Sequence, residues 1–531
     1  MSKPLSYQPL PNFGINGLNS QDNPATLDPS YLTSGDNIVL RESGRISFRK
    51  GLKQKVVPTG VAIGSMVEHN DQGTNKIFAS HGTSIYTIDF TSPNAAFPSS
   101  GADVKHTVGS TTADWQFVNF NNRLHCFHTG VIPQRYDGAL SAGAKWTAHA
   151  TDPASITTLF DPSCGMGFYG RLWVGGVTES KDVVYWSNLL DGDDWTGGDT
   201  GVLDLSKIWG TDEVVAIAPF YGQLIIFGKN NIAIYNSPTA VASLSLNEVI
   251  SGIGCVSRDS VQAIGDDLVF LSSTGLRSLL RTAEKDKVPL TDLTVNIKDR
   301  IIRNIDNSNN VKSVYVESEG IYIMSFVELN INYVCDFKHT TPQSTPRITT
   351  WTFDNDREPA SMINTELYSG LLVGQKDGSI AGYEGYFDTD LAWVSSAASY
   401  TNAAITADVS SVWIPMGESV TASILKKIIL VLEGGSGAVL GLRWFKDYSL
   451  NSSSTTQITL RPTTSGSTAL YGNAASLYGA SKYTPIYGLR EYQSALTGSA
   501  KNLKLNMSIV SNGFDTQIQD LSLISLQGKI R

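Results

Sequence analysis

A turn followed by a short apolar strand returns seven times between residues 75 and 373. Successive repeats are about 44 to 53 residues apart, judged from the first apolar residue after each turn: Ile77, Leu124, Leu172, Leu224, Leu268, Ile321 and Leu371. A second strand-like run follows each of these strands, so every unit contains a hairpin. Self-similarity at this period is the signature of a repeat architecture.

Units of about 40 to 50 residues made of short strands are typical of β-propeller blades. The runs at residues 224–227 and 268–271 are continuously apolar, which indicates burial on both faces between neighbouring blades, and we expect such strands to lie nearest the axis. The sequence therefore predicts an all-β chain with a six- or seven-bladed propeller over residues 59–390. Successive sandwich domains would also place hairpins at this spacing and remain an alternative.

The flanking segments lack the repeat. Residues 1–58 are rich in Pro, Asn, Asp and Gly, with strand-like runs only at 37–40 and 45–48, and we interpret them as an extended docking arm. Ala, Ser and Thr dominate residues 395–411, which suggests a linker. Residues 391–531 are predicted to form a C-terminal β-sandwich-like domain with a long loop at 449–500, of the kind that is usually functional or ordered by a partner.

Composition narrows the function classes. The formal charge of −9, from 40 basic and 49 acidic residues, argues against a protein that binds the phosphate backbone of nucleic acids independently of sequence. The four cysteines are far apart with no CxxC pair, so we expect reduced, buried thiols. No signal peptide and no apolar run of membrane-spanning length are visible, which predicts synthesis in the cytoplasm and no membrane span.

The chain carries no recognisable local catalytic motif. The string at residues 187–195 resembles a sialidase-type turn but has the wrong spacing, and its carboxylates lack the EF-hand order of calcium ligands, so we interpret it as a solvated turn. His125 and His128 should point to opposite faces of a strand and cannot share an ion. We predict no enzyme, no cofactor and no metal site.

Two other functions stay open at this stage. A glycosidase pair of carboxylates brought together from distant blades would leave no local signature. A glycan-binding propeller would expose aromatic side chains in a shallow groove, for which Trp186 and Trp195 are candidates.

Three stretches carry a family resemblance. Residues 13–51, with Gly17-Leu18-Asn19, a Pro, Asn37 and a closing Arg49-Lys50-Gly51, resemble the opening of tail nozzle (tail tubular protein B) and packaged-DNA-stabilisation proteins of short-tailed bacteriophages. Residues 252–258 and 268–277 look like a propeller blade of the same family, and residues 523–529 are similar to its end.

The resemblance implies a virion protein of the phage tail, with six copies in a ring below the portal and adaptor. The ring would retain packaged DNA and conduct it during ejection without binding it specifically, and propeller loops would narrow the bore. The implied partners are further copies of the chain, the tail adaptor, and tail fibres or spikes. The residues assigned by this resemblance to assembly contacts are Phe13, Gly17, Leu18, Asn19, Asn37, Arg49 and Gly51. Deleting residues 1–50 would then leave a folded propeller that fails to join the tail.

Overall fold

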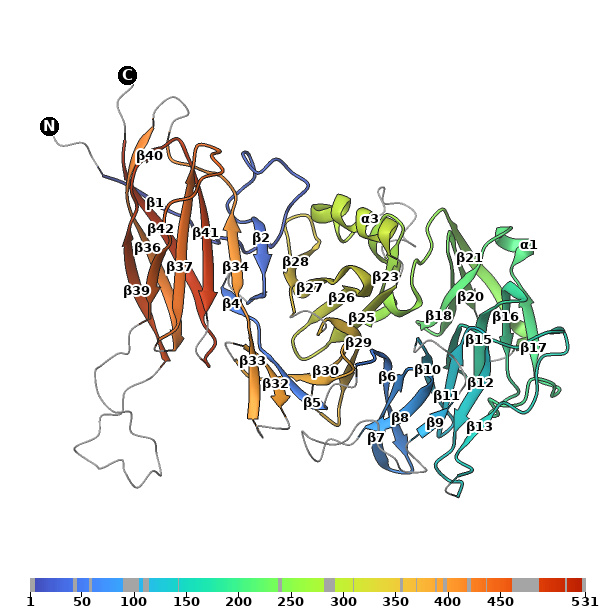
Figure 1. The fold of residues 1–531 in the computed structure, drawn as a ribbon. Helices are drawn as coiled ribbons and strands as arrows, with labels where there is room; N and C mark the ends of the chain where they lie inside the picture. The colour runs from blue at the N-terminus through green and yellow to red at the C-terminus, as the bar shows by residue number, and fades with distance from the viewer. Residues whose placement is uncertain are drawn as a thin grey trace.

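The computed structural model shows a chain built mainly of β-strands, with a propeller and a C-terminal sandwich side by side (Figure 1). It describes residues 5–41, 45–56, 60–88, 105–107, 114–141, 143–236, 241–280, 292–308, 310–353, 357–368, 370–386, 389–394, 399–417, 422–435, 437–460, 487–510 and 513–527. Among these residues, no helix is long and apolar enough to cross a membrane.

The first four blades are antiparallel four-stranded sheets, each made of consecutive strands. They comprise β6 (Ile63–Asp71), β7 (Thr74–His81), β8 (Ser84–Ile88) and β9 (Lys105–Thr107); β10 (Gln116–Phe120), β11 (Arg123–His128), β12 (Val131–Tyr136) and β13 (Trp146–Ala148); β14 (Cys164–Phe168), β15 (Arg171–Val177), β16 (Ser180–Trp186) and β17 (Gly201–Asp204); and β18 (Val214–Phe220), β19 (Gln223–Gly228), β20 (Asn231–Asn236) and β21 (Ser245–Ser251).

Two more four-stranded blades lie inside larger sheets, and one three-stranded sheet completes the ring. The three-stranded sheet is β22 (Gln262–Ile264), β23 (Asp267–Ser272) and β24 (Gly275–Ser278); the others are β25 (Val311–Val316), β26 (Ile321–Phe326), β27 (Ile331–Thr340) and β28 (Pro346–Trp351), and β29 (Pro359–Thr365), β30 (Gly370–Gln375) and β31 (Ile380–Tyr383) with β5 (Leu52–Val56). The helical turns are α1 (Ser206–Trp209), α3 (Lys298–Asn307), η2 (Val241–Ser243), η3 (Arg258–Ser260), η4 (Val295–Ile297) and η5 (Val327–Leu329).

An N-terminal strand closes the ring. Strand β5 precedes the first blade in sequence but pairs antiparallel with β31 of the last, so one chain segment ties both ends of the propeller together. An apolar cluster containing Val56, Ile63, Ile77 and Leu372 packs the last blade against the first. The predicted arm at 1–58 therefore contributes its last strand to the propeller.

Apolar clusters also fill the spaces between the other blades. Phe227 of β19 and Phe270 of β23, for example, pack against each other across one such space, with ring centroids 5.0 Å apart and planes tilted by 51°. The continuously apolar runs are thus buried on both faces, as the sequence predicts, but they are the second strands of their sheets. Our expectation that they lie nearest the axis is wrong, because the first strands β6, β10, β22, β25 and β29 line the central cavity.

The C-terminal domain is a sandwich of two sheets that the arm helps to build. One sheet contains β1 (Leu5–Pro9), β3 (Ile38–Leu40), β4 (Ile46–Phe48), β36 (Ser423–Gly435), β39 (Tyr487–Ala495), β40 (Ser499–Ala500) and β42 (Gln517–Leu526). The facing strands are β2 (Leu32–Asp36), β34 (Ala407–Ser411), β35 (Ile414–Pro415), β37 (Val439–Lys446), β38 (Thr456–Thr459) and β41 (Asn502–Val510).

One sheet runs from the propeller into the sandwich. Strand β2 of the arm lies between β28 of a blade, which it meets in parallel at Asp36 and Thr350, and β34 of the sandwich, which it meets antiparallel. Strands β32 (Thr389–Val394) and β33 (Ser399–Ala404) likewise extend the last blade beyond β5. The segment interpreted as a linker around 395–411 thus contains strands of both bodies.

The structure also revises the predicted loop at 449–500. Strand β38 and the nine-residue strand β39 lie inside that range, and β39 pairs with β36 along its whole length. The run of Gly, Ser and Thr made this region look like one long loop, whereas residues 461–486 of it lie outside the described residues.

A buried ion pair holds the arm in place where the propeller and the sandwich meet. The Arg49 guanidinium binds the Asp390 carboxylate through two bonds of 3.1 and 2.9 Å, and its Nε donates to Asn37 Oδ1 at 2.9 Å. The Asn37 amide in turn donates to Thr352 Oγ1 at 2.7 Å, and Asp390 accepts the Leu52 backbone N–H at 2.7 Å. The network therefore joins the arm, a blade and the strand that follows the last blade.

Replacing Arg49 with Met should destabilise the protein by about 3–5 kcal/mol, because it leaves the Asp390 carboxylate buried without its cation. The double variant R49M/D390N should recover part of that loss, since the remaining group is then neutral. Urea unfolding of the two single variants and the double variant gives the coupling. A change of less than about 0.5 kcal/mol in R49M would contradict this role of the ion pair.

Candidate functional site

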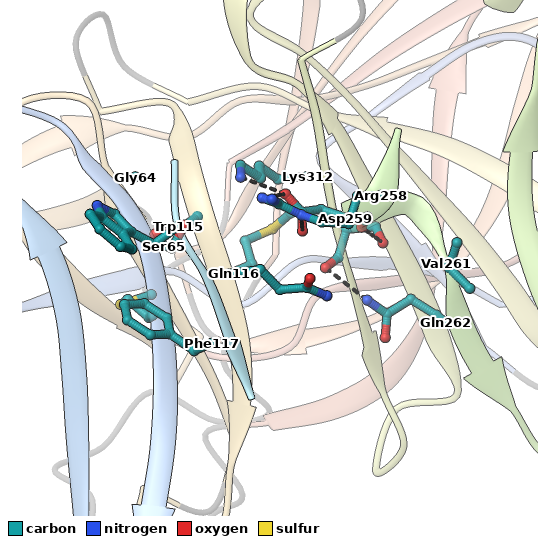
Figure 2. A pocket seen from close by; sticks show the side chains of 14 residues that line it. Gly64, Ser65, Trp115, Gln116, Phe117, Arg258, Asp259, Val261, Gln262 and Lys312 are labelled. Atoms are coloured by element: carbon teal, nitrogen blue, oxygen red, sulfur yellow. Dashed lines mark hydrogen bonds and ion pairs between the residues drawn. The ribbon is translucent and has the colours of Figure 1, made fainter. Parts of the chain in front are cut away.

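The propeller encloses a cavity of about 250 Å³ at its axis. Its walls come from the first strands of several blades and include Trp115, Gln116, Gln262 and Lys312 (Figure 2). A neighbouring cavity of about 480 Å³ shares Arg258 and Asp259 with it. A pocket formed by convergent blades is the default candidate site of such a fold.

Four alternating charges occupy the boundary between the two cavities. Lys312 of β25 binds the Asp259 carboxylate at 2.6 Å and also bonds to Asp114 Oδ1. Arg258 binds the same two carboxylates at 2.9 Å each and donates to the Ser163 carbonyl at 2.6 Å. The network thus links the segments before β10 and β14 to η3 and β25, on opposite sides of the axis.

The charges hold one another in the ionised state. Burial alone would raise the pKa of Asp259 and Asp114, but the cations of Arg258 and Lys312 outweigh it and keep both pKa values below their ordinary range. Burial lowers the pKa of Lys312, yet the two carboxylates reverse this and raise it. Every member is therefore charged and paired at neutral pH.

This arrangement is poorly suited to acid–base chemistry. Asp114 and Asp259 do converge from distant parts of the chain, as a glycosidase pair would, but a general acid needs a raised pKa to keep its proton. Both carboxylates are instead paired with the same two cations. The network instead links segments of different blades to one another across the axis through ion pairs.

Sequence reasoning missed this network because its members are far apart. Arg258 and Asp259 sit in a short 3-10 turn, while Lys312 and Asp114 come from other blades. The one local signal was Lys312 itself, a lysine beside Val311 in a strand whose residues are mostly buried.

A second buried polar group joins the blades of β11 and β16. His149 Nε2 lies 3.0 Å from His125 Nδ1 and 3.6 Å from Asp193 Oδ1, while the Trp195 indole N–H donates to His149 Nδ1 at 3.1 Å. As predicted, His125 does not meet His128; its partner comes from 24 residues further along the chain.

Hydrogen bonding decides how this group is protonated. Because Trp195 donates to Nδ1, the proton of neutral His149 is on Nε2, from which it is donated to His125. Burial, together with the smaller effect of nearby Arg135, lowers the pKa of His125 to about 3 and that of His149 well below its ordinary value. His125, His149 and Asp193 each offer a ligand atom within 4.8 Å of the others, but a cation at His149 Nε2 would first have to displace the proton that His125 accepts, and the Asp193 carboxylate is already paired with arginine.

The segment at residues 187–195, predicted to be a solvated turn, is a polar turn of which one carboxylate is buried. Asp194 accepts backbone N–H groups of Thr196 and Gly197 at 2.9 and 3.0 Å, which is turn chemistry. Asp193 is buried and binds Arg123 at 3.2 Å and also Arg135. The carboxylates are thus bound to protein groups.

The proposed lectin aromatics are buried. Trp186 and Trp195 are only 7% and 3% exposed, and their indole N–H groups are engaged with the Asp199 carbonyl and His149. The prediction that they form an exposed groove is wrong.

All seven residues predicted as assembly contacts are buried within their own chain: Phe13, Gly17, Leu18, Asn19, Asn37, Arg49 and Gly51. Phe13 and Leu18 belong to the large core shared by the arm and the sandwich. Gly17, with φ +72°, packs so closely on β28 that a Cβ there would lie 2.6 Å from the Ile348 carbonyl oxygen. These residues hold the arm against its own chain and are not exposed to a neighbouring copy.

The four cysteines, at positions 126, 164, 255 and 335, are all buried and unpaired, as predicted. Burial raises the pKa of Cys164, Cys255 and Cys335 to about 12, which makes them unreactive thiols.

No protein-family model and no curated protein matches the sequence. Among solved structures, the chain is similar to the extracellular domain of a one-component system from B. thetaiotaomicron, with 11% identity, a TM-score of 0.40, and coverage of 78% of this chain and 48% of that one. It is also similar to the Pan2 WD40 domain of Neurospora crassa, with 9% identity, a TM-score of 0.38, and coverage of 64% and 97%. This chain spans about half the length of the first structure, and both likenesses concern the fold alone.

Asp259→Asn should cost about 2–4 kcal/mol at neutral pH by leaving two buried cations with one carboxylate. The folded-state pKa of Asp259 is lower than its unfolded value, so its stabilisation is complete above about pH 5 and is lost as the pH falls. Urea unfolding across pH 3–7 should therefore show a shallower acid slope in D259N. Asp306→Asn, an exposed carboxylate on α3, is the control, and an equal slope change in both variants would refute the assignment.

His149→Gln should reduce the loss of stability between about pH 6.5 and 4. The folded pKa of His149 is lowered, so only the unfolded state takes up its proton in this range and stability falls as the pH falls. Glutamine keeps an acceptor for Trp195 and a donor for His125 but does not titrate. Melting temperatures at pH 7.5 and 5 test this, with exposed His339→Gln as the control; an unchanged drop in H149Q would contradict it.

Proposed function

We propose that this chain is a structural protein of a phage tail, forming a nozzle ring of six copies below the portal and adaptor. The ring retains packaged DNA and conducts it during ejection. The sequence resemblance at residues 13–51, 252–258, 268–277 and 523–529 motivates the proposal. It also sets the partners: the adaptor, the tail fibres or spikes, and neighbouring copies of the chain.

The observation that carries the proposal is the continuity of the two bodies. A sheet passes from β28 through the arm strand β2 into the sandwich, and one apolar core contains side chains of the arm, of the blades at β22–β28 and of the sandwich. A subunit of a pressurised tube must transmit force without bending, and shared sheets and a shared core provide this better than a flexible linker would.

The closed axis also favours a structural role. A cavity of about 250 Å³ crossed by ion pairs cannot pass a nucleic acid, so the conduit in this proposal is the space enclosed by the ring of copies. The net charge of −9 lowers the affinity of that wall for phosphates and allows DNA to slide. Because the axial carboxylates are paired, the proposal includes no catalytic step.

An exposed apolar patch is suited to contact between copies. Its members are Tyr169, Leu189, Leu190 and Tyr221, which are 44%, 48%, 60% and 68% exposed. They lie together, since Leu190 N–H donates to the Gly170 carbonyl at 2.7 Å and the Tyr169 hydroxyl reaches the turn that holds Tyr221. Exposed patches of this kind commonly mark interaction sites.

The first experiment is light scattering and negative-stain imaging of the purified chain, alone and mixed with adaptor rings. We expect sixfold rings, formed alone or only on the adaptor. Tyr221→Ser with Leu190→Ser should weaken ring formation at least about tenfold while leaving the melting temperature nearly unchanged, because both side chains are on the surface.

Leu367→Ser is the matched control, since this 48% exposed leucine lies in the equivalent turn of the last blade. A monomer that ignores the adaptor, or one that binds or cleaves a glycan, would refute the nozzle proposal.

A further inference from the structure

A cavity of about 330 Å³ lies where the arm, the blade of β25–β28 and the sandwich meet. Its wall contains four cationic residues, Arg41, Arg45, Lys338 and Arg347, and two carboxylates, Glu319 and Asp336. The local balance is positive in a chain whose net charge is −9. This cavity is separate from the axial network.

Both carboxylates are already paired with cationic side chains. Asp336 binds Arg347, whose guanidinium also donates to the carbonyls of Leu40 and Arg41 at 3.0 and 3.2 Å. Glu319 binds Lys50 at 2.5 Å and lies 3.8 Å from Arg41. The structure therefore has no spare anion within the described lining of the cavity.

Cationic donors do remain. Among the described residues, the side chains of Arg45 and Lys338 have no hydrogen-bond or ion-pair partner. The Arg347 side chain is only 2% exposed, and its buried Nε–H has no acceptor among the described residues. An unpaired buried donor on a guanidinium is costly, and because Arg347 lines this cavity, the charge of an anion bound here would offset part of that cost.

The position of Lys338 is built into the fold. Gly320 has φ +60°, and a Cβ at this residue would lie 2.5 Å from Lys338 Cγ and 2.7 Å from its Cε. The lysine stem therefore lies directly over the glycine, which the Phe337 N–H bonds at 3.0 Å. Glycine at this position, with its positive φ, leaves room for the Lys338 stem to lie over the backbone beside the cavity.

We propose that this cavity is a binding site for a tetrahedral oxyanion, phosphate or sulfate. Guanidinium groups and an ammonium from separate elements line the cavity, which suits an anion with several acceptor oxygens. The volume admits a small ion with its waters and is far too small for a folded partner. The bound anion would connect the arm to the blade through Arg45 and Lys338.

Inorganic phosphate is the probe, titrated into the purified full-length chain by calorimetry and by thermal melting at constant ionic strength. We expect saturable binding of one ion per chain and a melting temperature that rises with phosphate but not with chloride. Sulfate should compete, whereas glutarate, a planar-carboxylate probe, should compete at least about tenfold less well.

Lys338→Gln and Arg45→Gln should each weaken phosphate binding about tenfold or more without lowering the melting temperature in chloride, because neither side chain has a partner to lose. Gly320→Ala should weaken binding as well, by displacing the Lys338 stem. Lys207→Gln, on a side chain that is 82% exposed on α1, is the control. Equal stabilisation by chloride, equal competition by glutarate, or unchanged affinity in both K338Q and R45Q would overturn the proposal.

Discussion

The backbone pairing of the N-terminal arm is the constraint on which the rest of the structure depends. Within residues 5–56 the chain supplies strands to the sandwich, to the sheet between sandwich and propeller, and to the last blade. Each of these sheets would otherwise present an open edge with unpaired N–H and C=O groups. Because a single segment fills all three positions, the propeller closes and the sandwich forms only when the arm is in place.

The buried polar groups make sense in this context. Arg49 is almost fully desolvated, which is expensive unless every donor is used, and its donors reach the arm, the blade end and Asp390. The axial network applies the same rule to the cations of Arg258 and Lys312, whose side chains are 12% and 9% exposed, although one of their partners, Asp114, is 56% exposed. Buried charge in this protein specifies which elements meet, while the apolar clusters between blades supply most of the stabilisation.

The sequence predicted what depends on local pattern. Hairpins, apolar second strands and the short strands at 37–40 and 45–48 all follow from alternation and turn residues, and the structure contains them. The sequence could not predict that β2 pairs with β28 or that β5 pairs with β31, because the partner of a strand leaves no local signal in the sequence. Phe13 and Arg49 looked like contacts for another copy because an arm poor in strands resembles a docking segment; their partner is the same chain.

Because a local pattern does not reveal long-range partners, the buried polar groups could not be predicted from the sequence either. His125 could be judged only against His128, whereas its partner His149 directly follows β13, and the hydrogen bond between the two histidines appears only once the fold brings them together. The difference between net charge and local charge shows this limit most clearly. A net value of −9 describes the long-range field that a DNA phosphate meets, but it says nothing of a cavity in which Arg45 and Lys338 are left without carboxylates. The proposed nozzle wall, which would repel nucleic acid along its length, would thus still hold one small anion where the propeller and the sandwich join.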